Sequence, residues 1–216
     1  ALITGVAQSY PISVRPMMEI IGKSPGVDKI ATTNLMITAR GPLFVSDTSI
    51  NIDPDSLELA KIAQMTGRTA SMFGVSPVIA MTSYANFGSS SHPHATKVTE
   101  AVKYLHQYYP DLVVDGEVQT DFALNSELLQ SKFPFSKLAG KKVNTLIFPN
   151  LESANSTYKM LKELNGIDSI GPIMMGMQKP VHILQLGASV DEIVNMAAVA
   201  VIDAQQKEKH ANKKAK

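Results

Sequence analysis

The sequence predicts an α/β fold with a mixed, mostly parallel sheet that helices cover on both faces. Short apolar runs alternate with helical segments of about 12 to 18 residues, a pattern typical of parallel strands joined by crossover helices. Two strand-like runs flank the turn Arg40-Gly41-Pro42 and add an antiparallel element. With 216 residues, the chain is long enough for one to two domains of roughly 150 residues each.

The N-terminal third supplies a strand, a helix, a hairpin and a long helix. The opening residues 1–5 resemble the end of a buried strand, and a helix is predicted over residues 14–21, with Pro16 in its first turn, where a missing N–H is harmless. The hairpin covers residues 35–46. Asp53-Pro54 predicts the next helix start, with an N-cap carboxylate followed by proline, and Gly74 predicts its end.

The rest of the chain alternates regularly. Strands are predicted at residues 77–83, 111–115 and 144–148, and helices at residues 95–109, 121–132 and 152–165. Ser189 and Glu192 fit a capping box that opens a final helix over residues 193–204, whose many small apolar residues predict burial. After Gln205 the apolar periodicity stops, so we expect frayed helix and disorder at residues 206–216.

The composition excludes several kinds of function. The net charge is +1, but the last ten residues carry five Lys and one Glu, so the remaining residues carry −3. A nucleic-acid-binding body needs a surplus of Lys and Arg, and we therefore expect no nucleic-acid partner. The chain has no Cys, which excludes disulfides, thiolate chemistry and Cys-ligated metals. No apolar run approaches the roughly 20 residues that span a bilayer, so we expect no membrane partner.

Familiar catalytic signatures are also missing. The sequence contains no GxGxxG fingerprint, no GxxxxGK[ST] phosphate loop, no HExxH and no GxSxG elbow. The sequence therefore lacks the simplest motifs for nucleotide binding, for a zinc protease and for a serine hydrolase.

The most informative loop is Ser83 to Ser91, which follows a predicted strand and precedes a helix. Ligands of open α/β sheets bind at such carboxyl ends, where loop and helix N–H groups favour an anion. The alternative is a polar connector whose serines cap the next helix, and the residues themselves leave both interpretations open.

Other polar residues have ordinary explanations beside functional ones. His92 and His94 could bind a metal, but no third ligand follows at a telling spacing, so we expect no metal site. Asp115, Glu117 and Asp121 gather three carboxylates near the end of a predicted strand. Asp115-Gly116 is typical of a turn, and Asp121 can serve as the N-cap of the helix that follows. Arg15 lies near a helix start, where it needs an acidic partner, an anionic ligand or water. The methionines of residues 171–180 fit core filling.

Four longer segments carry a family resemblance. Residues 115–124 (DGEVQTDFAL), 146–161 (LIFPNLESANSTYKML), 170–181 (IGPIMMGMQKPV) and 189–204 (SVDEIVNMAAVAVIDA) resemble the C-terminal portion of the phosphate acetyl/butyryltransferase family. The resemblance extends over nearly the whole chain before the tail. Within the family, the loop SYANFGSS and the stretch KPVHIL most resemble the version fused behind bacterial hybrid NADP-dependent malic enzymes.

The departures from the family decide the expected activity. Active members carry a Ser-Arg pair where this sequence has Gln185 and Leu186, and an Asp where it has Glu192. They often have a Lys near the position of Phe87. Since a Leu cannot neutralise the charge of an acyl phosphate, we expect acetyl transfer to be absent or negligible and name no catalytic residue. The resemblance implies ligand-binding roles for Arg15, Ser83, Asn86, Gly88, Ser89, Ser90 and Gln185.

The resemblance implies a two-lobed α/β/α sandwich, similar to the isocitrate/isopropylmalate dehydrogenase class, with coenzyme A in the cleft. Residues 26–169 would form one lobe, and residues 1–25 with 170–205 an incomplete part of the other. The expected ligand is acetyl-CoA or CoA, with no cofactor in this segment. NADP and Mg²⁺ or Mn²⁺ would belong to upstream malic enzyme domains. The protein would be a cytoplasmic homo-oligomer, at least a dimer, formed through the second lobe, which is the lobe of residues 26–169.

Three functions remain open at this point. The first is a non-catalytic domain that binds acetyl-CoA to regulate a malic enzyme. The second is an active phosphate acetyltransferase with an unusual site, and the third is a purely structural oligomerisation module.

Overall fold

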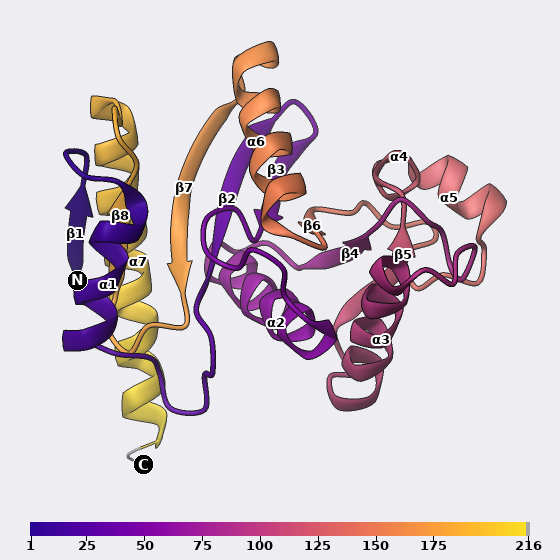
Figure 1. The fold of residues 1–216 in the computed structure, drawn as a ribbon, viewed down its shortest axis with the longest axis horizontal. Coiled ribbons are helices and arrows are strands. Elements are labelled where there is room, and N and C mark those ends of the chain that lie inside the picture. Colours follow the sequence, from indigo (N-terminus) through magenta and orange to yellow (C-terminus); the bar gives the residue numbers. More distant parts are fainter. Residues whose placement is uncertain (215–216) are drawn as a thin grey trace.

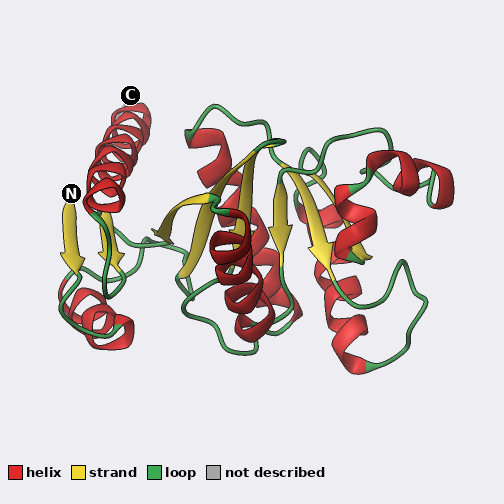
Figure 2. Cartoon of the chain, turned by 90° about the horizontal axis from the view of Figure 1, so that it is seen from above, coloured by secondary structure: helices red, strands yellow, loops and turns green. Residues whose placement is uncertain are grey.

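Two sheets of different size organise the molecule. The computed structural model describes the backbone of residues 1–214, and their side chains except at positions 165, 210, 211, 213 and 214. A six-stranded sheet occupies most of the molecule, and a two-stranded sheet with its helices lies at one end (Figure 1). The helices lie on both faces of the larger sheet (Figure 2), as the sequence predicted.

The larger sheet has the strand order β5-β4-β6-β3-β2-β7. Its strands are β2 (Ala31–Thr38), β3 (Gly41–Ser46), β4 (Val78–Thr82), β5 (Val113–Val118), β6 (Thr145–Ile147) and β7 (Asp168–Met175). The neighbours from β5 to β3 are parallel, whereas β2 is antiparallel to both β3 and β7. The sheet is therefore mixed and mostly parallel, and the predicted hairpin at residues 35–46 is confirmed as β2 and β3.

Each face of this sheet has its own apolar core. On one face, α2 (Ser56–Met72) and α3 (Pro93–Tyr108) pack through side chains such as Leu59 and Leu105. On the other face lie α4 (Thr120–Leu124), α5 (Ser126–Lys132) and α6 (Leu151–Asn165). These helices bury side chains on both faces, which explains why β4 and β6 are mostly apolar, with one Thr each.

The strand order places a crevice between β4 and β6. From the carboxyl end of β4 the chain leads through α3 to β5 at one edge of the sheet. From the carboxyl end of the neighbouring β6 it leads through α6 to β7 at the other edge, on the opposite face. Where two such connections diverge, a crevice opens at the carboxyl ends of the strands, and open α/β sheets bind ligands there.

The small sheet joins the two ends of the chain. β1 (Leu2–Gly5) pairs in parallel with β8 (Val181–Leu184). Helix α1 (Tyr10–Ile20) packs against one set of β8 side chains, and α7 (Val190–Lys214) packs on β7 and β8. Met174, Met175 and Met177 are at most 5 % exposed, the first and last beside this sheet and Met175 in the core under α2 and α3, which confirms core filling by these methionines. β7, which precedes β8 in the chain, belongs to the larger sheet.

Two helix starts differ from the sequence predictions. α1 begins at Tyr10 with Pro11 in its first turn, so Pro16 lies inside the helix instead of near its start. Asp55, not Asp53, caps α2, because the Asp55 side chain accepts from the Glu58 N–H (2.8 Å) while the Glu58 side chain accepts from the Asp55 N–H (3.0 Å). Asp53 pairs instead with Lys97 of α3.

The roles predicted for Asp115 and Asp121 are also wrong. Asp115 and Gly116 lie inside β5 rather than in a turn, because the buried Asp115 carboxylate accepts hydrogen bonds from Ser136 and from the Lys137 N–H. Asp121 lies in the first turn of α4 and does not cap it. The predicted helix over residues 121–132 is divided at Asn125, whose side chain caps α5 by accepting from the Leu128 N–H.

The C-terminal helix is longer and more exposed than predicted. The capping box is confirmed, since the Ser189 hydroxyl accepts from the Glu192 N–H and the Glu192 carboxylate accepts from the Ser189 N–H. α7 then continues to Lys214, so the prediction of disorder is wrong for residues 206–214, while residues 215–216 lie outside the described part. Val190 and Val194 are 75 % and 60 % exposed, so α7 buries only one face. None of the described helices is long and apolar enough to cross a membrane.

Candidate functional site

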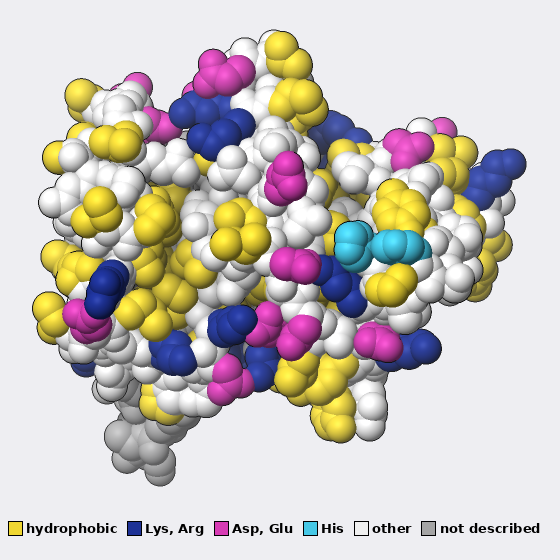
Figure 3. All heavy atoms as spheres, viewed as in Figure 1, with side chains coloured by type: hydrophobic (Ala, Val, Ile, Leu, Met, Phe, Trp, Pro, Cys, Tyr) yellow, Lys and Arg dark blue, Asp and Glu magenta, His cyan; other side chains and the backbone are white. Residues whose placement is uncertain are grey.

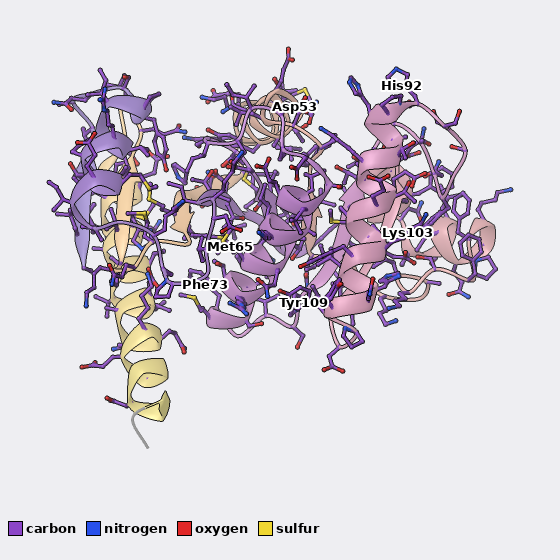
Figure 4. All side chains as sticks on the ribbon, turned by 60° about the horizontal axis from the view of Figure 1, so that its bottom comes forward. Asp53, Met65, Phe73, His92, Lys103 and Tyr109 are labelled. Carbon is purple, nitrogen blue, oxygen red and sulfur yellow. The ribbon has the colours of Figure 1, made fainter. Side chains whose placement is uncertain are left out.

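A pocket of about 650 Å³ lies in the crevice between β4 and β6. Its walls come from the segments after β3, β4 and β6 and from the first turns of α3 and α6. The lining residues are Ile52, Asp53, Ser83, Tyr84, His94, Lys97, Pro149, Asn150, Leu151, Glu152, Asn155 and Ser156. Asp53 and His92 lie at the same end of the molecule in Figure 4, whereas Phe73 and Tyr109, which follow α2 and α3, lie toward the other end. The pocket therefore occupies the carboxyl edge of the sheet.

An ion pair sets the charge of this pocket. The Lys97 Nζ lies 2.5 Å from Asp53 Oδ1 and also donates to the Pro54 carbonyl. The hydrogen bond and the positive charge of Lys97 hold the pKa of Asp53 below its ordinary value. Glu152 adds a second carboxylate to the lining, so Lys97 faces two carboxylates there. Figure 3 shows histidine side chains on the surface of this face with acidic and basic side chains close by.

Helix N–H groups around the pocket are largely occupied within the protein. At the start of α3, the His92 ring nitrogen Nδ1 accepts from the His94 N–H, and the His92 carbonyl accepts from the next two N–H groups. At the start of α6, the Leu151 N–H donates to the Ile52 carbonyl and the Ser153 N–H to the Asn150 side chain. These helix ends therefore offer an anion few free donors.

The loop at residues 83–91 is closed on itself and on β5. The Phe87 N–H donates to the Glu117 carbonyl, and the Gly88 N–H donates to the buried Glu117 carboxylate (2.6 Å). Asn86 exchanges two hydrogen bonds with Gln119: its side-chain nitrogen Nδ2 donates to Gln119 Oε1, and its side-chain oxygen Oδ1 accepts from the Gln119 backbone N–H, both at 2.8 Å. These N–H groups of the loop are thus paired within the protein.

Hydroxyl and ring groups of this loop remain available. Tyr84 is 56 % exposed, and its hydroxyl pairs with the Ser90 hydroxyl at 3.0 Å. Ser83 lines the pocket, while the Ser89 hydroxyl accepts from the Asn86 N–H. Of the predicted ligand-binding residues, Ser83 alone is in the pocket lining.

A buried polar cluster adjoins the pocket through α6 and the segment after β3. Asn155, which lines the pocket, donates to the Thr48 carbonyl. The neighbouring Asp47 carboxylate is 3 % exposed and accepts five hydrogen bonds from Thr32, Ser49 and Asn51. The hydroxyls of Tyr10 and Ser49 are buried without a hydrogen-bond partner. Burial and the charges of Asp47 and Tyr158 raise the pKa of Tyr10, so its hydroxyl stays protonated.

Two contacts connect α6 to the segment after β8. The Gln185 amide nitrogen donates to the Tyr158 hydroxyl at 2.9 Å, and the Lys162 Nζ lies 2.9 Å from Glu192 Oε1. Burial alone would raise the pKa of Glu192, but hydrogen bonds from Lys162 and Ser189 hold it below its ordinary value. Leu186, between these contacts, is 63 % exposed. Gln185 therefore reaches the polar cluster, and Leu186 does not.

Arg15 and His92 are not among the residues that line the pocket, whereas His94 is. The Arg15 side chain is 83 % exposed and pairs with Glu19 on its own helix at 3.0 Å, so it has the acidic partner that its position required. The His92 and His94 rings are exposed and pack edge to face. Among the described residues, no three His, Asp or Glu side chains gather as a metal site.

Sequence reasoning missed most of the pocket. Asp53, Lys97, Asn150, Asn155 and Ser156 come from three separate segments that only the strand order brings together. One local signal was present, because Asn150 follows a predicted strand and precedes a predicted helix, which is the position of a capping residue beside a carboxyl-edge crevice.

The chain is similar to two kinds of protein. The family model described as phosphate acetyl/butaryl transferase matches residues 1–201. The NADP-dependent malic enzyme of Escherichia coli (strain K12) is 37% identical over 207 residues, which are 95% of this chain and 27% of the enzyme. The phosphate acetyltransferase of Bacillus subtilis (strain 168) is 37% identical over 205 residues, 94% of this chain and 62% of that protein. The chain thus spans about a quarter of that malic enzyme.

Solved structures have the same fold. A phosphotransacetylase from Streptococcus pyogenes superposes with a TM-score of 0.87 at 37% identity, covering 96% of this chain and 62% of that one. The EutD phosphotransacetylase from Staphylococcus aureus gives a TM-score of 0.85 at 36% identity, covering 95% and 62%.

Proposed function

Since the chain belongs to the phosphate acetyl/butaryl transferase family, we propose that it binds acetyl-CoA or CoA in its cleft without transferring the acyl group. The observation that carries this proposal is the segment after β8. Gln185 is engaged by Tyr158, and Leu186 is an exposed apolar side chain. The sequence resemblance places a Ser-Arg pair of active members at these two positions. Loss of a cation that stabilises developing charge typically costs several kcal/mol of transition-state stabilisation.

Glu192 supports the same proposal. Active members have an Asp at this position, whereas Glu192 is committed to the capping box of α7 and to the ion pair with Lys162. Both of its roles are structural, so it is not free to act on a ligand. The same contact pairs Lys162 with a carboxylate. Among the described contacts of the segment after β8, no unpaired cation therefore remains.

We place this domain in a malic enzyme, as in the relatives with that name. There it would regulate, in response to acetyl-CoA, the NADP-dependent conversion of malate to pyruvate and CO₂. NADP and the Mg²⁺ or Mn²⁺ ion would bind to other domains of that protein. Residues 1–25 and 170–205 would form part of a lobe that further polypeptide completes, because β1 has an unpaired edge and α7 exposes Val190 and Val194. Homo-oligomerisation would use the lobe of residues 26–169.

Calorimetric titration of the 216-residue protein with acetyl-CoA tests the proposal. We expect saturable binding that phosphate does not convert into turnover. Absence of binding would favour the structural module, for which deletion of the domain would disrupt assembly while acetyl-CoA would not affect malate oxidation.

The alternative of an active acetyltransferase rests on Arg15, which the resemblance assigns to the ligand. Turnover of acetyl-CoA and phosphate to acetyl phosphate that is abolished by Arg15→Ala would establish this alternative. Because the Arg15 side chain is 83 % exposed and, among the described residues, forms an ion pair with Glu19 alone, the substitution should leave the fold unchanged, so loss of turnover would report on the reaction.

A further inference from the structure

A second hollow lies beside the turn between β2 and β3. It has a volume of about 470 Å³ and is lined by Arg40, Asp121, Leu124, Asn125, Ser126 and Glu127. Arg40 lies in the turn, at the amino end of β3, and the other lining residues lie in or between α4 and α5. The hollow shares no lining residue with the pocket at the carboxyl ends of β4 and β6.

The hollow holds charges of both signs that do not pair with one another. Arg40, Asp121 and Glu127 are all exposed. Among the described residues, none of these three side chains forms an ion pair or a side-chain hydrogen bond, whereas other exposed charges are paired, such as Lys61 with Asp28. A guanidinium has donors and no acceptor, and a carboxylate accepts from such donors in a well-defined geometry. The same surface therefore offers a site for a carboxylate and a site for a guanidinium.

Apolar side chains are exposed around the same turn. Ile37 lies directly opposite Pro42 across the hairpin, and both are exposed, Ile37 at 48 %. Leu164, which is 76 % exposed, comes shortly before Asp168, the residue that pairs with Ile37, so the end of α6 lies at the same end of the sheet (Figure 1). Exposed apolar groups next to unpaired charges favour a protein partner over a small ion.

The arrangement of the charges favours a second copy of this chain as that partner. In a two-fold symmetric dimer every contact occurs twice, so a surface that carries both members of an ion pair can bind to itself. Arg40 of each copy would then face the Asp121 and Glu127 carboxylates of the other. A partner with charges of a single sign would instead bring like charges together somewhere in the hollow.

We infer that the surface formed by the β2–β3 turn, α4 and α5 is the two-fold interface of a homodimer, in which Arg40 pairs reciprocally with Asp121 and Glu127. The inference rests on the proposed function only for the expectation that the lobe of residues 26–169 forms a homo-oligomer. A stable dimer buries about 1,200 Å² or more in total, so the interface extends from the hollow to the exposed apolar side chains of the hairpin.

Sedimentation equilibrium of the 216-residue protein over a range of concentrations measures the dissociation constant of the dimer. The two test variants are Arg40→Glu and the double variant Asp121→Arg with Glu127→Arg. Arg68→Glu is the matched control, because Arg68 is an exposed arginine of α2 outside the hollow. Thermal melting followed by circular dichroism checks that each variant is folded.

Each test variant alone brings like charges together at both symmetry-related contacts, so dimerisation should weaken by about tenfold or more, whereas Arg68→Glu should match the wild type. An equimolar mixture of the two test variants should dimerise again. In the mixed dimer the charges introduced by the two variants attract each other at one contact, and the native pairing remains at the other. A single chain that carries all three substitutions should also form a homodimer.

Three results would each overturn the inference: a wild-type protein that is monomeric at every concentration, a dimer that Arg40→Glu leaves intact, and test variants that do not recover on mixing. Calorimetry with acetyl-CoA separates this inference from the proposed function, because Arg40 lies outside the candidate site. A dimer with the expected charge dependence that does not bind acetyl-CoA would refute the acetyl-CoA proposal alone. A monomer that binds acetyl-CoA would refute the interface alone.

Discussion

Replacing Asp203 with Asn should destabilise the protein, because Asp203 lies at the junction of α7, β8 and β7. Its carboxylate lies 3.1 Å from the Lys207 Nζ and 3.4 Å from Nε2 of His182, which is fully buried. His182 Nδ1 accepts from the Met174 N–H, so Nε2 carries the proton that faces Asp203. Asn keeps an acceptor but loses the charge, so we expect a loss of about 1–2 kcal/mol in the free energy of unfolding at pH 7.

The effect should depend on pH in a defined direction. Burial alone would raise the pKa of Asp203, but the interactions with His182 and Lys207 hold it below its ordinary value of 3.8. A lowered pKa in the folded state means that the ionised carboxylate stabilises the protein above pH 3.8, and that this contribution is lost as the pH falls through the folded-state pKa. The difference between wild type and variant should therefore shrink in acid.

Urea denaturation followed by far-UV circular dichroism at neutral pH and at about pH 3 measures both effects, and the chain has no Trp to serve as a fluorescence probe. Asp111→Asn, on an exposed turn, is the matched control and should change stability by less than about 0.5 kcal/mol. A loss for Asp203→Asn as small as that of the control, or a loss that is the same at both pH values, would refute the reasoning.

Local signals in the sequence predicted the elements that depend on neighbouring residues. Gly166 ends α6 in a left-handed conformation, and Ser189 and Glu192 form the capping box, as their spacing indicated. The N-cap of α2 could not be assigned in this way, since Asp53 and Asp55 both suit the position. The choice depends on Lys97, which lies on another helix and engages Asp53.

The sequence predicted only the part of the candidate site that lies in the loop directly after one strand. The segment after β4 contributes Ser83 and Tyr84, and the sequence singled it out. The opposite wall of the pocket comes from α6, because β6 inserts between β3 and β4 in the sheet. Neither the closure of the 83–91 loop by Glu117 nor the Gln185–Tyr158 contact has a local sequence signal, since each joins residues at least 27 positions apart.

Five further substitutions, two of them controls, test the fold and the loop. Asp55→Ala should lower the free energy of unfolding by about 1 kcal/mol, because it removes the capping box of α2. Asp53→Ala removes only an exposed ion pair and should lower it by less. Thermal melting compares the two variants, and equal losses of stability would contradict the assigned cap. Gly5→Ala should lose at least about 2 kcal/mol in urea denaturation, because its Cβ would lie 2.2 Å from the Leu184 carbonyl oxygen; Gly74→Ala, with a positive φ but open space, isolates the backbone strain and should lose about 1 kcal/mol. Gln119→Ala should speed amide hydrogen exchange at residues 84–89 with little change in melting temperature, because it removes the side-chain hydrogen bonds to the Asn86 amide nitrogen and to the Tyr84 carbonyl, while the backbone N–H of residue 119 still donates to Asn86; unchanged exchange would show that this N–H and Glu117 suffice to hold the loop.

The most direct test of the central claim is a coupled assay for acetyl phosphate, run with acetyl-CoA and phosphate at concentrations where calorimetry shows the protein to be saturated with acetyl-CoA. We expect the saturated protein to form no acetyl phosphate above the background rate, because Gln185 and Leu186 supply neither a nucleophile nor a cation. Sustained formation of acetyl phosphate by the wild-type protein would contradict it.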